Sequence, residues 1–388
     1  MDTSDPPRIA WTSGTWRSRH PEQTWSALEP VAEAAGVTRV ADVTGLDDIG
    51  VPVHMAVRPH ARALSVSQGK GTTGILSKIS AVMEAIELYY AENLADADIA
   101  GTPATELGSL LSYPVEALDL HPGGLWHRRY PLDWLVCSSM ITGRSAALPR
   151  ELVDLDRTVV SDSWCPPLFL STSNGLASGN SDEEAMLHAL CEVAERDSIA
   201  AAGDVLGRHL FDPAEVADPA VDALCERIAA ASARLRVFDL TGPMGLPCVG
   251  ASVGGGSLPL VFGGFGCHPS TAVATCRAIT EAVQQRLTVI AGTRDDLPDE
   301  VYDLLHLGFV RETTPARDEI EYVSPPADLP VAGLGQAMTC VAEKIHKFTG
   351  YEPLCLRLTE SGAPVSVVKV VAPGLRLAGH GNYTAAGG

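Results

Sequence analysis

The chain is 388 residues long, with 46% hydrophobic and 20% charged residues, proportions that fit a globular protein and exclude a largely disordered one. Its formal net charge is −20, which argues against a nucleic-acid binder, because such proteins need clustered lysines and arginines. The excess of acid fits either simple solubility or carboxylates that hold a metal ion.

Three segments of the chain share one design, in which a glycine-rich stretch precedes a long helix that carries an acidic or amide pair. We predict the glycine-rich stretches to be loops, and they run from Ser65 to Gly74, from Ser171 to Asp182 and from Val261 to Ser270. The pairs are Glu84 with Glu87, Glu192 with Glu195, and Glu281 with Gln284. Aligned on the first acid, the helices read AVMEAIE, ALCEVAE and AITEAVQ, which indicates an internal repeat.

The rest of the chain alternates short β-rich runs with helical patterns. Strand-like runs occupy residues 52–59, 134–142, 234–241, 246–255 and 259–266, and residues 363–374 predict a buried last strand. The segment from Asp212 to Ala231 predicts a surface helix, and Thr105 to Leu118 predicts a loop-and-helix insert. Ser181 and Ser270 are expected to cap the second and third repeated helices. Strands alternating with helices predict an α/β fold.

The cysteines and the apolar pattern predict a cytoplasmic protein. All nine cysteines occur singly, without a Cys-x-x-Cys pair, which favours reduced thiols over a disulfide framework or a zinc site. The start of the chain lacks an export signal, and no run of about 18 uncharged apolar residues predicts a membrane span.

The glutamate pairs carry the strongest chemical signal. Residues three apart lie on one face of a helix, so Glu84 with Glu87, and Glu192 with Glu195, each present two carboxylates in one direction. If the two helices meet, four like charges share one place, and they need cations to do so. Magnesium is the natural counterion, because it is hard and prefers oxygen ligands.

The glycine-rich stretches suggest a phosphate-binding role. A glycine-rich loop before a helix offers free N–H groups and the positive end of the helix dipole. Lys70 and Asn180 add polar groups, although neither loop has Walker spacing. His188, four residues before Glu192, is either a metal ligand or, more simply, a core histidine, and His268 is expected to orient the third loop.

These motifs together resemble the YcaO superfamily over nearly the whole chain. The resemblance rests on SVSQGKGTTG, MEAIE, SNGLASGNSDEEA, CEVAERD, GCHPS, TEAVQQR and GTRDD, in this order. It implies an ATP- and Mg²⁺-dependent enzyme that phosphorylates the oxygen of a peptide backbone amide. A neighbouring Cys, Ser or Thr as nucleophile would give an azoline, a sulfide equivalent a thioamide, and an amine an amidine. It also implies an N-terminal segment over residues 1–60, a catalytic core over 61–374 and a flexible tail over 375–388.

The resemblance assigns roles to particular residues. The magnesium ligands that it implies are Glu84, Glu87, Glu192 and Glu195. The ATP-binding residues are Arg17, Thr24, Lys70, Asn180, Glu184 and Arg196. The catalytic residues are Arg196, Gln285, Arg286 and Arg294.

The subtype and the partners are expectations of the same kind. The chain ends in GHGNYTAAGG instead of the Pro-rich motif common in azoline-forming members, and SVSQGKG and VVKVVAPGL are similar to members that work with a TfuA-like partner in thioamide formation. We therefore expect a precursor peptide as substrate and a TfuA-like or leader-binding protein as partner, with no nucleic acid and no membrane. Azoline and amidine formation, a homodimer, and a nucleotide-binding scaffold without turnover remain open alternatives.

Overall fold

The computed structural model describes residues 9–158, 167–294 and 319–377. The helices of these residues are α1 (Pro21–Ala34), α2 (Gly74–Glu92), α3 (Asp182–Ala202), α4 (Pro219–Ala230), α5 (Thr271–Ala291) and α7 (Leu334–Thr349). The three predicted repeat helices correspond to α2, α3 and α5. Ser181 caps α3 by accepting the N–H of Glu184, as predicted, whereas Ser270 occupies the N-cap of α5 without a side-chain bond.

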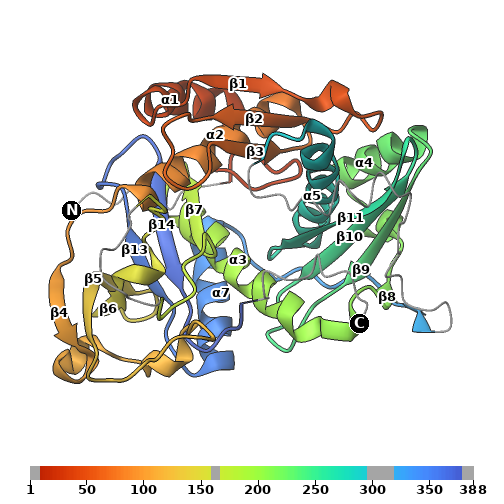
Figure 1. The fold of residues 1–388 in the computed structure, drawn as a ribbon. Coiled ribbons are helices and arrows are strands. Elements are labelled where there is room, and N and C mark those ends of the chain that lie inside the picture. The colour runs from red at the N-terminus through yellow and green to blue at the C-terminus, as the bar shows by residue number, and fades with distance from the viewer. Residues whose placement is uncertain (1–8, 159–166, 295–318, 378–388) are drawn as a thin grey trace.

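The strands form three sheets (Figure 1). The first contains β1 (Arg39–Asp42), β2 (Val53–Val57) and β3 (Val66–Lys70). The second has the order β11 (Leu258–Cys267), β10 (Cys248–Gly255), β9 (Ala233–Asp239), β8 (His209–Leu210) and β12 (Glu321–Tyr322). The third has the order β4 (Ile99–Pro103), β5 (Pro131–Ser139), β13 (Leu354–Arg357), β14 (Ser366–Val371) and β7 (Leu176–Gly179), with β6 (Ser145–Pro149) beside β5.

Helices cover these sheets and bury the apolar residues between them. Ile279 and Val283 of α5, for example, belong to one buried cluster with Val249 and Ala251 of β10. Within the described residues the strand pairs are antiparallel, except for the parallel pair of β8 and β12. The mixed α/β fold class is the predicted one.

Each glycine-rich stretch contains residues of a strand, so the prediction that all three are loops was wrong. Residues 66–70, 176–179 and 258–267 form β3, β7 and β11, and only short turns join each strand to its helix. A Cβ atom on Gly69 would lie 1.9 Å from the backbone N of Ala81 in α2. The same atom on Gly264 would lie 2.2 Å from the N of Ala282 in α5. The glycines therefore let each helix cross its own strand at backbone contact.

The three strand–helix units pack in a cycle, which gives the internal repeat its structural meaning. Besides its own strand, each helix contacts the strand of another unit: α5 meets β3, α2 meets β7 and α3 meets β11. One side chain on each strand contacts that second helix, and the three pairs are Lys70 with Glu281, Ser178 with Glu87, and Cys267 with Cys191. Figure 1 shows α2, α3 and α5 around the middle of the molecule. The repeated acids consequently meet there.

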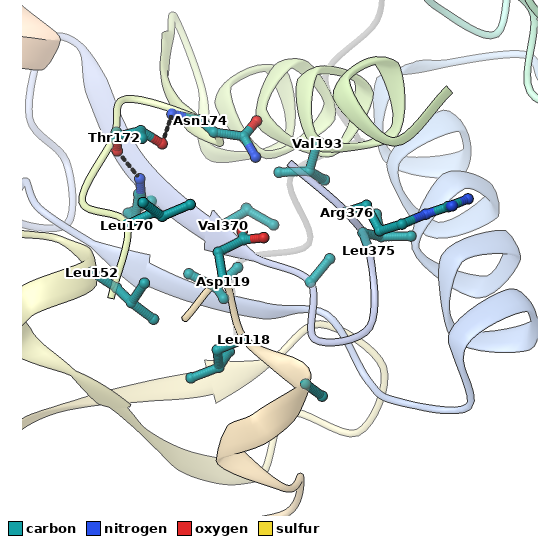
Figure 2. Close-up of a pocket in the computed structure, with 14 residues that line it drawn as sticks. Leu118, Asp119, Leu152, Leu170, Thr172, Asn174, Val193, Val370, Leu375 and Arg376 are labelled. Atoms are coloured by element: carbon teal, nitrogen blue, oxygen red, sulfur yellow. Dashed lines mark hydrogen bonds between the residues drawn. The ribbon is translucent and has the colours of Figure 1, made fainter. Parts of the chain in front are cut away.

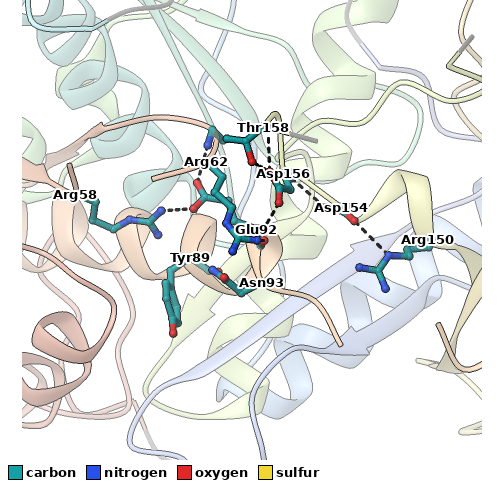
Figure 3. Close-up of polar contacts among 10 residues, drawn as sticks. Arg58, Arg62, Tyr89, Glu92, Asn93, Arg150, Asp154, Asp156 and Thr158 are labelled. Atoms are coloured by element: carbon teal, nitrogen blue, oxygen red, sulfur yellow. Dashed lines mark hydrogen bonds and ion pairs between the residues drawn. The ribbon is translucent and has the colours of Figure 1, made fainter. Parts of the chain in front are cut away.

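A buried ion pair anchors the C-terminal end of α2 (Figure 3). Arg58 pairs with Glu92, and the side chains are 4% and 1% exposed. Arg62 binds the carbonyl of Glu92 at 3.1 Å and the carboxylate of Asp156 at 2.9 Å. These contacts fix the C-terminal end of α2 to the segment that carries Arg58 and Arg62 and, through Arg62, to Asp156.

Three further predictions need correction or restriction. The insert at residues 105–118 contains short 3-10 turns instead of an α-helix, and the surface helix of 212–231 divides into a 3-10 turn, Pro213–Val216, and α4. The predicted tail starts too early, because Leu375 is buried and the N–H groups of Arg376 and Leu377 bind Asp197 and Asp119. Residues 378–388 of that tail and Cys165 lie outside the described residues. The other cysteines are free thiols, and no helix of the described part is long and apolar enough to cross a membrane.

Candidate active site

The acid pair of α2 lies between two strands. Glu84 accepts a hydrogen bond of 2.8 Å from the backbone N–H of Gln68 on β3, and Glu87 accepts one of 2.6 Å from the hydroxyl of Ser178 on β7. Burial raises the pKa of Glu87 to about 8; the Ser178 hydrogen bond opposes this rise, and the nearby carboxylates of Glu84 and Glu192 add to it. The α2 pair and the first acid of α3 therefore lie within one electrostatic neighbourhood.

The acid pair of α3 extends this neighbourhood to α5. Burial raises the pKa of Glu195 to about 7, and the carboxylate of Glu281 on α5 raises it further. Burial also raises the pKa of Glu192, while Arg196 opposes that rise. Glu281 itself is paired with Lys70 of β3. Acids from all three repeated helices thus share one network with Lys70 and Arg196.

The acid network suits magnesium, although its side chains alone do not form a complete set of metal ligands. Among residues 9–158, 167–294 and 319–377, no three His, Cys, Asp or Glu side chains stand close enough to hold a metal ion. The predicted ligands nevertheless influence one another, since Glu84 and Glu192 raise the pKa of Glu87, and Lys70 and Arg196 offset part of the charge near Glu195. Magnesium commonly takes one or two carboxylates and completes its octahedron with water and substrate phosphate oxygens, so this donor set suits it.

A pocket next to the network collects most of the predicted ATP-binding residues. Arg17, Thr24, Lys70 and Asn180 line it, together with Arg277 of α5, and we call it the Arg17 pocket. It encloses about 750 Å³ of empty space, open solvent included.

Glu184 organises one wall of the Arg17 pocket. The carboxylate is 3% exposed and accepts hydrogen bonds from Arg17 at 2.9 Å, from the N–H and hydroxyl of Ser18 at 2.8 Å, and from Asn180 at 3.1 Å. Burial alone would raise the pKa of Glu184, but Arg17 and Ser18 outweigh it and lower the pKa. The Oδ1 atom of Asn180 is buried and has no hydrogen-bond partner among the described residues, so it can accept a donor from a bound molecule.

The opposite wall is suited to anions. Gly71 and Thr72, in the turn before α2, line the pocket beside Lys70. The N-terminus of a helix carries partial positive charge and free N–H groups, which favour phosphate. Arg277 adds a second cation from α5. The phosphate site stays a prediction, and a turn of the chain would form it in place of a long glycine-rich loop.

Arg286, which the resemblance placed among the catalytic residues, is used by the fold. Its side chain is 1% exposed, and its Nε donates to both carboxylate oxygens of Asp47 at 3.0 and 2.9 Å. Its remaining nitrogens donate to the carbonyl of Gly255 at 3.1 Å and to the hydroxyl of Ser257 at 3.3 Å. These partners lie on the face of α5 away from Glu281, so the structure does not bring Arg286 to the network.

Three other predicted residues are placed less directly. Thr24 is buried in α1, where its hydroxyl donates to the carbonyl of His20 at 3.2 Å, so it lines the pocket by shape. Gln285 lies on α5 and Arg294 follows that helix; both are half-buried, and the pocket lining does not include them. Their catalytic roles stay predictions.

Arg277 was not predicted from the sequence, and the structure now shows the partners of His188 and His268. The guanidinium of Arg277 lies 2.6 Å from Nε2 of His188. Burial and the neighbouring Arg277 keep the pKa of His188 well below its usual range, so a neutral ring accepts from the arginine and is not available to a metal. Nδ1 of His268 accepts the N–H of Ser270 at 3.0 Å, which confirms its orienting role. The available signal for Arg277 was its spacing of four residues before Glu281.

Comparisons with known proteins agree with this geometry. The family model described as YcaO cyclodehydratase, ATP- and Mg²⁺-binding, matches residues 68–376. An uncharacterized protein of Mycobacterium tuberculosis is 40% identical over 97% of this chain and 86% of its own length. A Rhizobium leguminosarum protein named for the tfuA 3' region is 35% identical over 95% of this chain and 90% of its own length.

Solved structures show the same fold. YcaO from Methanopyrus kandleri, bound with AMPPCP and Mg²⁺, has a TM-score of 0.71 at 21% identity and covers 95% of this chain and 94% of its own. A heterocyclase in complex with substrate and cofactor has a TM-score of 0.74 at 22% identity over 97% of this chain, which spans 54% of that longer protein.

The predicted family and cofactors are thereby confirmed. The matched family is described as ATP- and Mg²⁺-binding. These are the two cofactors that the Arg17 pocket and the acid network fit. Membership also supports ATP-dependent peptide modification in general. The chain belongs to the YcaO family of ATP- and Mg²⁺-binding cyclodehydratases.

Proposed function

We propose that this protein uses ATP to phosphorylate the oxygen of a peptide backbone amide, and that a sulfur nucleophile then replaces that oxygen to give a thioamide. The carbonyl oxygen takes the terminal phosphoryl group, ADP leaves, and phosphate departs with the original oxygen when the C=S bond forms. A TfuA-like partner delivers the peptide or the sulfur. The single observation that carries the proposal is the meeting of acids from α2, α3 and α5 beside the Arg17 pocket.

The residues divide into two groups by what they can bind. Asn180 and the Arg17–Glu184 pair form the neutral, hydrogen-bonding wall that can orient a nucleoside. Lys70, Arg277 and the start of α2 form the wall that suits phosphates. Glu84, Glu87, Glu192 and Glu195 would hold magnesium, which when bound offsets charge on the transferred phosphoryl group.

The thioamide product is supported by one relative. The Rhizobium relative, which is 35% identical, is named for the tfuA 3' region. This name suggests a TfuA-like protein as partner. The alternative is azoline formation, favoured by the family description as cyclodehydratases.

Mass and isotope analysis test both levels of the proposal. With ATP, Mg²⁺, partner, peptide and sulfide, we expect a mass gain equal to the replacement of oxygen by sulfur, and a heavy-oxygen label in the amide should appear in phosphate. Label that remains in the peptide or reaches water while ATP is consumed would exclude amide phosphorylation. Label in phosphate with loss of water at a Cys, Ser or Thr would keep amide activation and replace the thioamide by an azoline.

A further inference from the structure

Lys369 on β14 is a buried lysine in an otherwise apolar strand. The residue is 4% exposed, and its Nζ donates one hydrogen bond of 2.6 Å, to the carbonyl of Thr172. The ion pairs of the described residues do not include it. Burial lowers the pKa of Lys369 to about 8, against the attraction of Glu192 and Asp119. A buried ammonium without an ion pair costs several kcal/mol, so its retention needs another reason than stability.

Lys369 lines a second pocket, which we call the Asp119 pocket (Figure 2). The pocket encloses about 480 Å³ of empty space, open solvent included. Its walls are mostly apolar, with Leu118 and Leu170 among the lining residues. The polar lining residues are Asp119, Thr172, Asn174, Lys369 and Arg376. Oδ1 of Asn174 is buried without a hydrogen-bond partner among the described residues.

The Asp119 pocket is separate from the Arg17 pocket and lies beside α3. The two pockets share no lining residue. Val193 of α3 lines the Asp119 pocket, and its neighbour Glu192 belongs to the acid network. Lys369 is attracted both to Glu192 and to Asp119. Lys369 therefore lines the second pocket within electrostatic reach of the acid network.

We propose that the Asp119 pocket is the acceptor subsite, which holds a short, extended, uncharged peptide segment. The reacting carbonyl oxygen accepts a hydrogen bond from the ammonium of Lys369, and backbone N–H groups donate to Oδ1 of Asn174 and to the carboxylate of Asp119. This deepens the proposed function and rests on it, because it places the amide in a pocket separate from the one proposed for the nucleotide. Lys369 orients the carbonyl and undergoes no covalent change.

The chemistry of the lining favours a peptide backbone over other small molecules. Arg376, the second cation of the lining, is mostly exposed and pairs with Asp197 at 3.5 Å, so Lys369 is the buried cation of the pocket. A free anion beside Lys369 would meet the carboxylate of Asp119, and an apolar ligand would leave Oδ1 of Asn174 without a partner. A backbone amide offers one acceptor and one donor in the same plane, which matches the ammonium of Lys369 and the acceptor oxygens of Asn174 and Asp119.

The test measures binding of a capped diglycine, N-acetyl-glycylglycine amide, by saturation-transfer NMR in the presence of Mg²⁺ and a non-hydrolysable ATP analogue. The variants are Lys369→Met, which removes the ammonium, and Ala372→Phe, which narrows the pocket; Lys347→Met, at an exposed site on α7, is the matched control. We expect the probe signal to fall at least fivefold in the first two variants and to stay at the wild-type level in the control. Affinity for the ATP analogue, measured by calorimetry, should change less than twofold in all three.

Each outcome decides the proposal. Wild-type signal in both pocket variants, loss in only one of them when both are folded, or no probe binding to the wild-type protein would overturn the subsite. If Lys369→Met does not fold, Ala372→Phe alone decides. Because the probe binds without turnover, a protein that binds it as expected but never phosphorylates an amide would refute the proposed function and leave the subsite standing.

Discussion

Replacing Arg286 by methionine tests whether this arginine supports the fold or takes part in the reaction. The substitution removes two hydrogen bonds to Asp47 and one each to Gly255 and Ser257, and it leaves the Asp47 carboxylate buried at 1% exposure. Removal of one partner from a buried ion pair typically costs about 3–5 kcal/mol. We expect a loss of about that size in the free energy of unfolding, measured by urea denaturation.

The double variant Asp47→Leu with Arg286→Met separates the two roles. It removes the stranded carboxylate as well, and apolar replacements of a whole buried pair are often nearly neutral, so most of the lost stability should return. Affinity of the folded protein for ATP with Mg²⁺ should stay within about twofold of wild type, because Arg286 faces away from the acid network. An Arg286→Met protein of wild-type stability that has lost ATP turnover would refute this reasoning and restore the catalytic assignment.

Three more predictions address the metal, the nucleotide and the repeat. Glu84→Gln and Glu195→Gln should each weaken binding of ATP with Mg²⁺ by about tenfold or more in calorimetry, whereas Glu226→Gln on an exposed face of α4 should not; unchanged affinity in both would remove the metal assignment. EDTA should abolish the rise in melting temperature given by ATP with Mg²⁺, and an equal rise with ATP alone would contradict the magnesium requirement. Gly69→Ala places a Cβ 1.9 Å from a backbone atom and should cost about 3 kcal/mol of stability, while Gly74→Ala meets nothing within 4 Å and should change it by at most about 1 kcal/mol; similar values for the two would argue against close helix–strand packing.

The sequence was sufficient for the acids because helical spacing fixes their direction. Glu84 with Glu87, and Glu192 with Glu195, could be paired from the chain alone, and the repeat showed that their helices are related. Glycine was less informative, since the same residue suits a flexible loop and a strand that another backbone crosses. Only the packing of α2 on β3 shows that Gly69 lies where the backbone of a helix crosses its strand.

Residues that act through distant partners were beyond sequence reasoning. Arg286 lies five positions after Glu281, which on an α-helix of 3.6 residues per turn turns it to a different face, but its partner Asp47 is 239 positions away. Lys369 is visible in the sequence as a charged residue inside the mainly apolar run SVVKVV. A lysine is rarely fully buried unless it is paired, so its burial within this strand could not be expected from the sequence.

The cyclic packing also explains why the third unit carries an amide where the first two carry an acid. The second acid of α2, Glu87, meets a hydroxyl donor, that of Ser178 on β7. The corresponding residue of α5, Gln284, meets the backbone carbonyl of Gln68 on β3, to which its amide donates at 3.5 Å. A carboxylate there would place two acceptors against each other in a partly buried site, at a cost of roughly 1–3 kcal/mol. The neighbouring strand therefore selects the residue, and the site keeps two acid pairs although the fold supplies three helices.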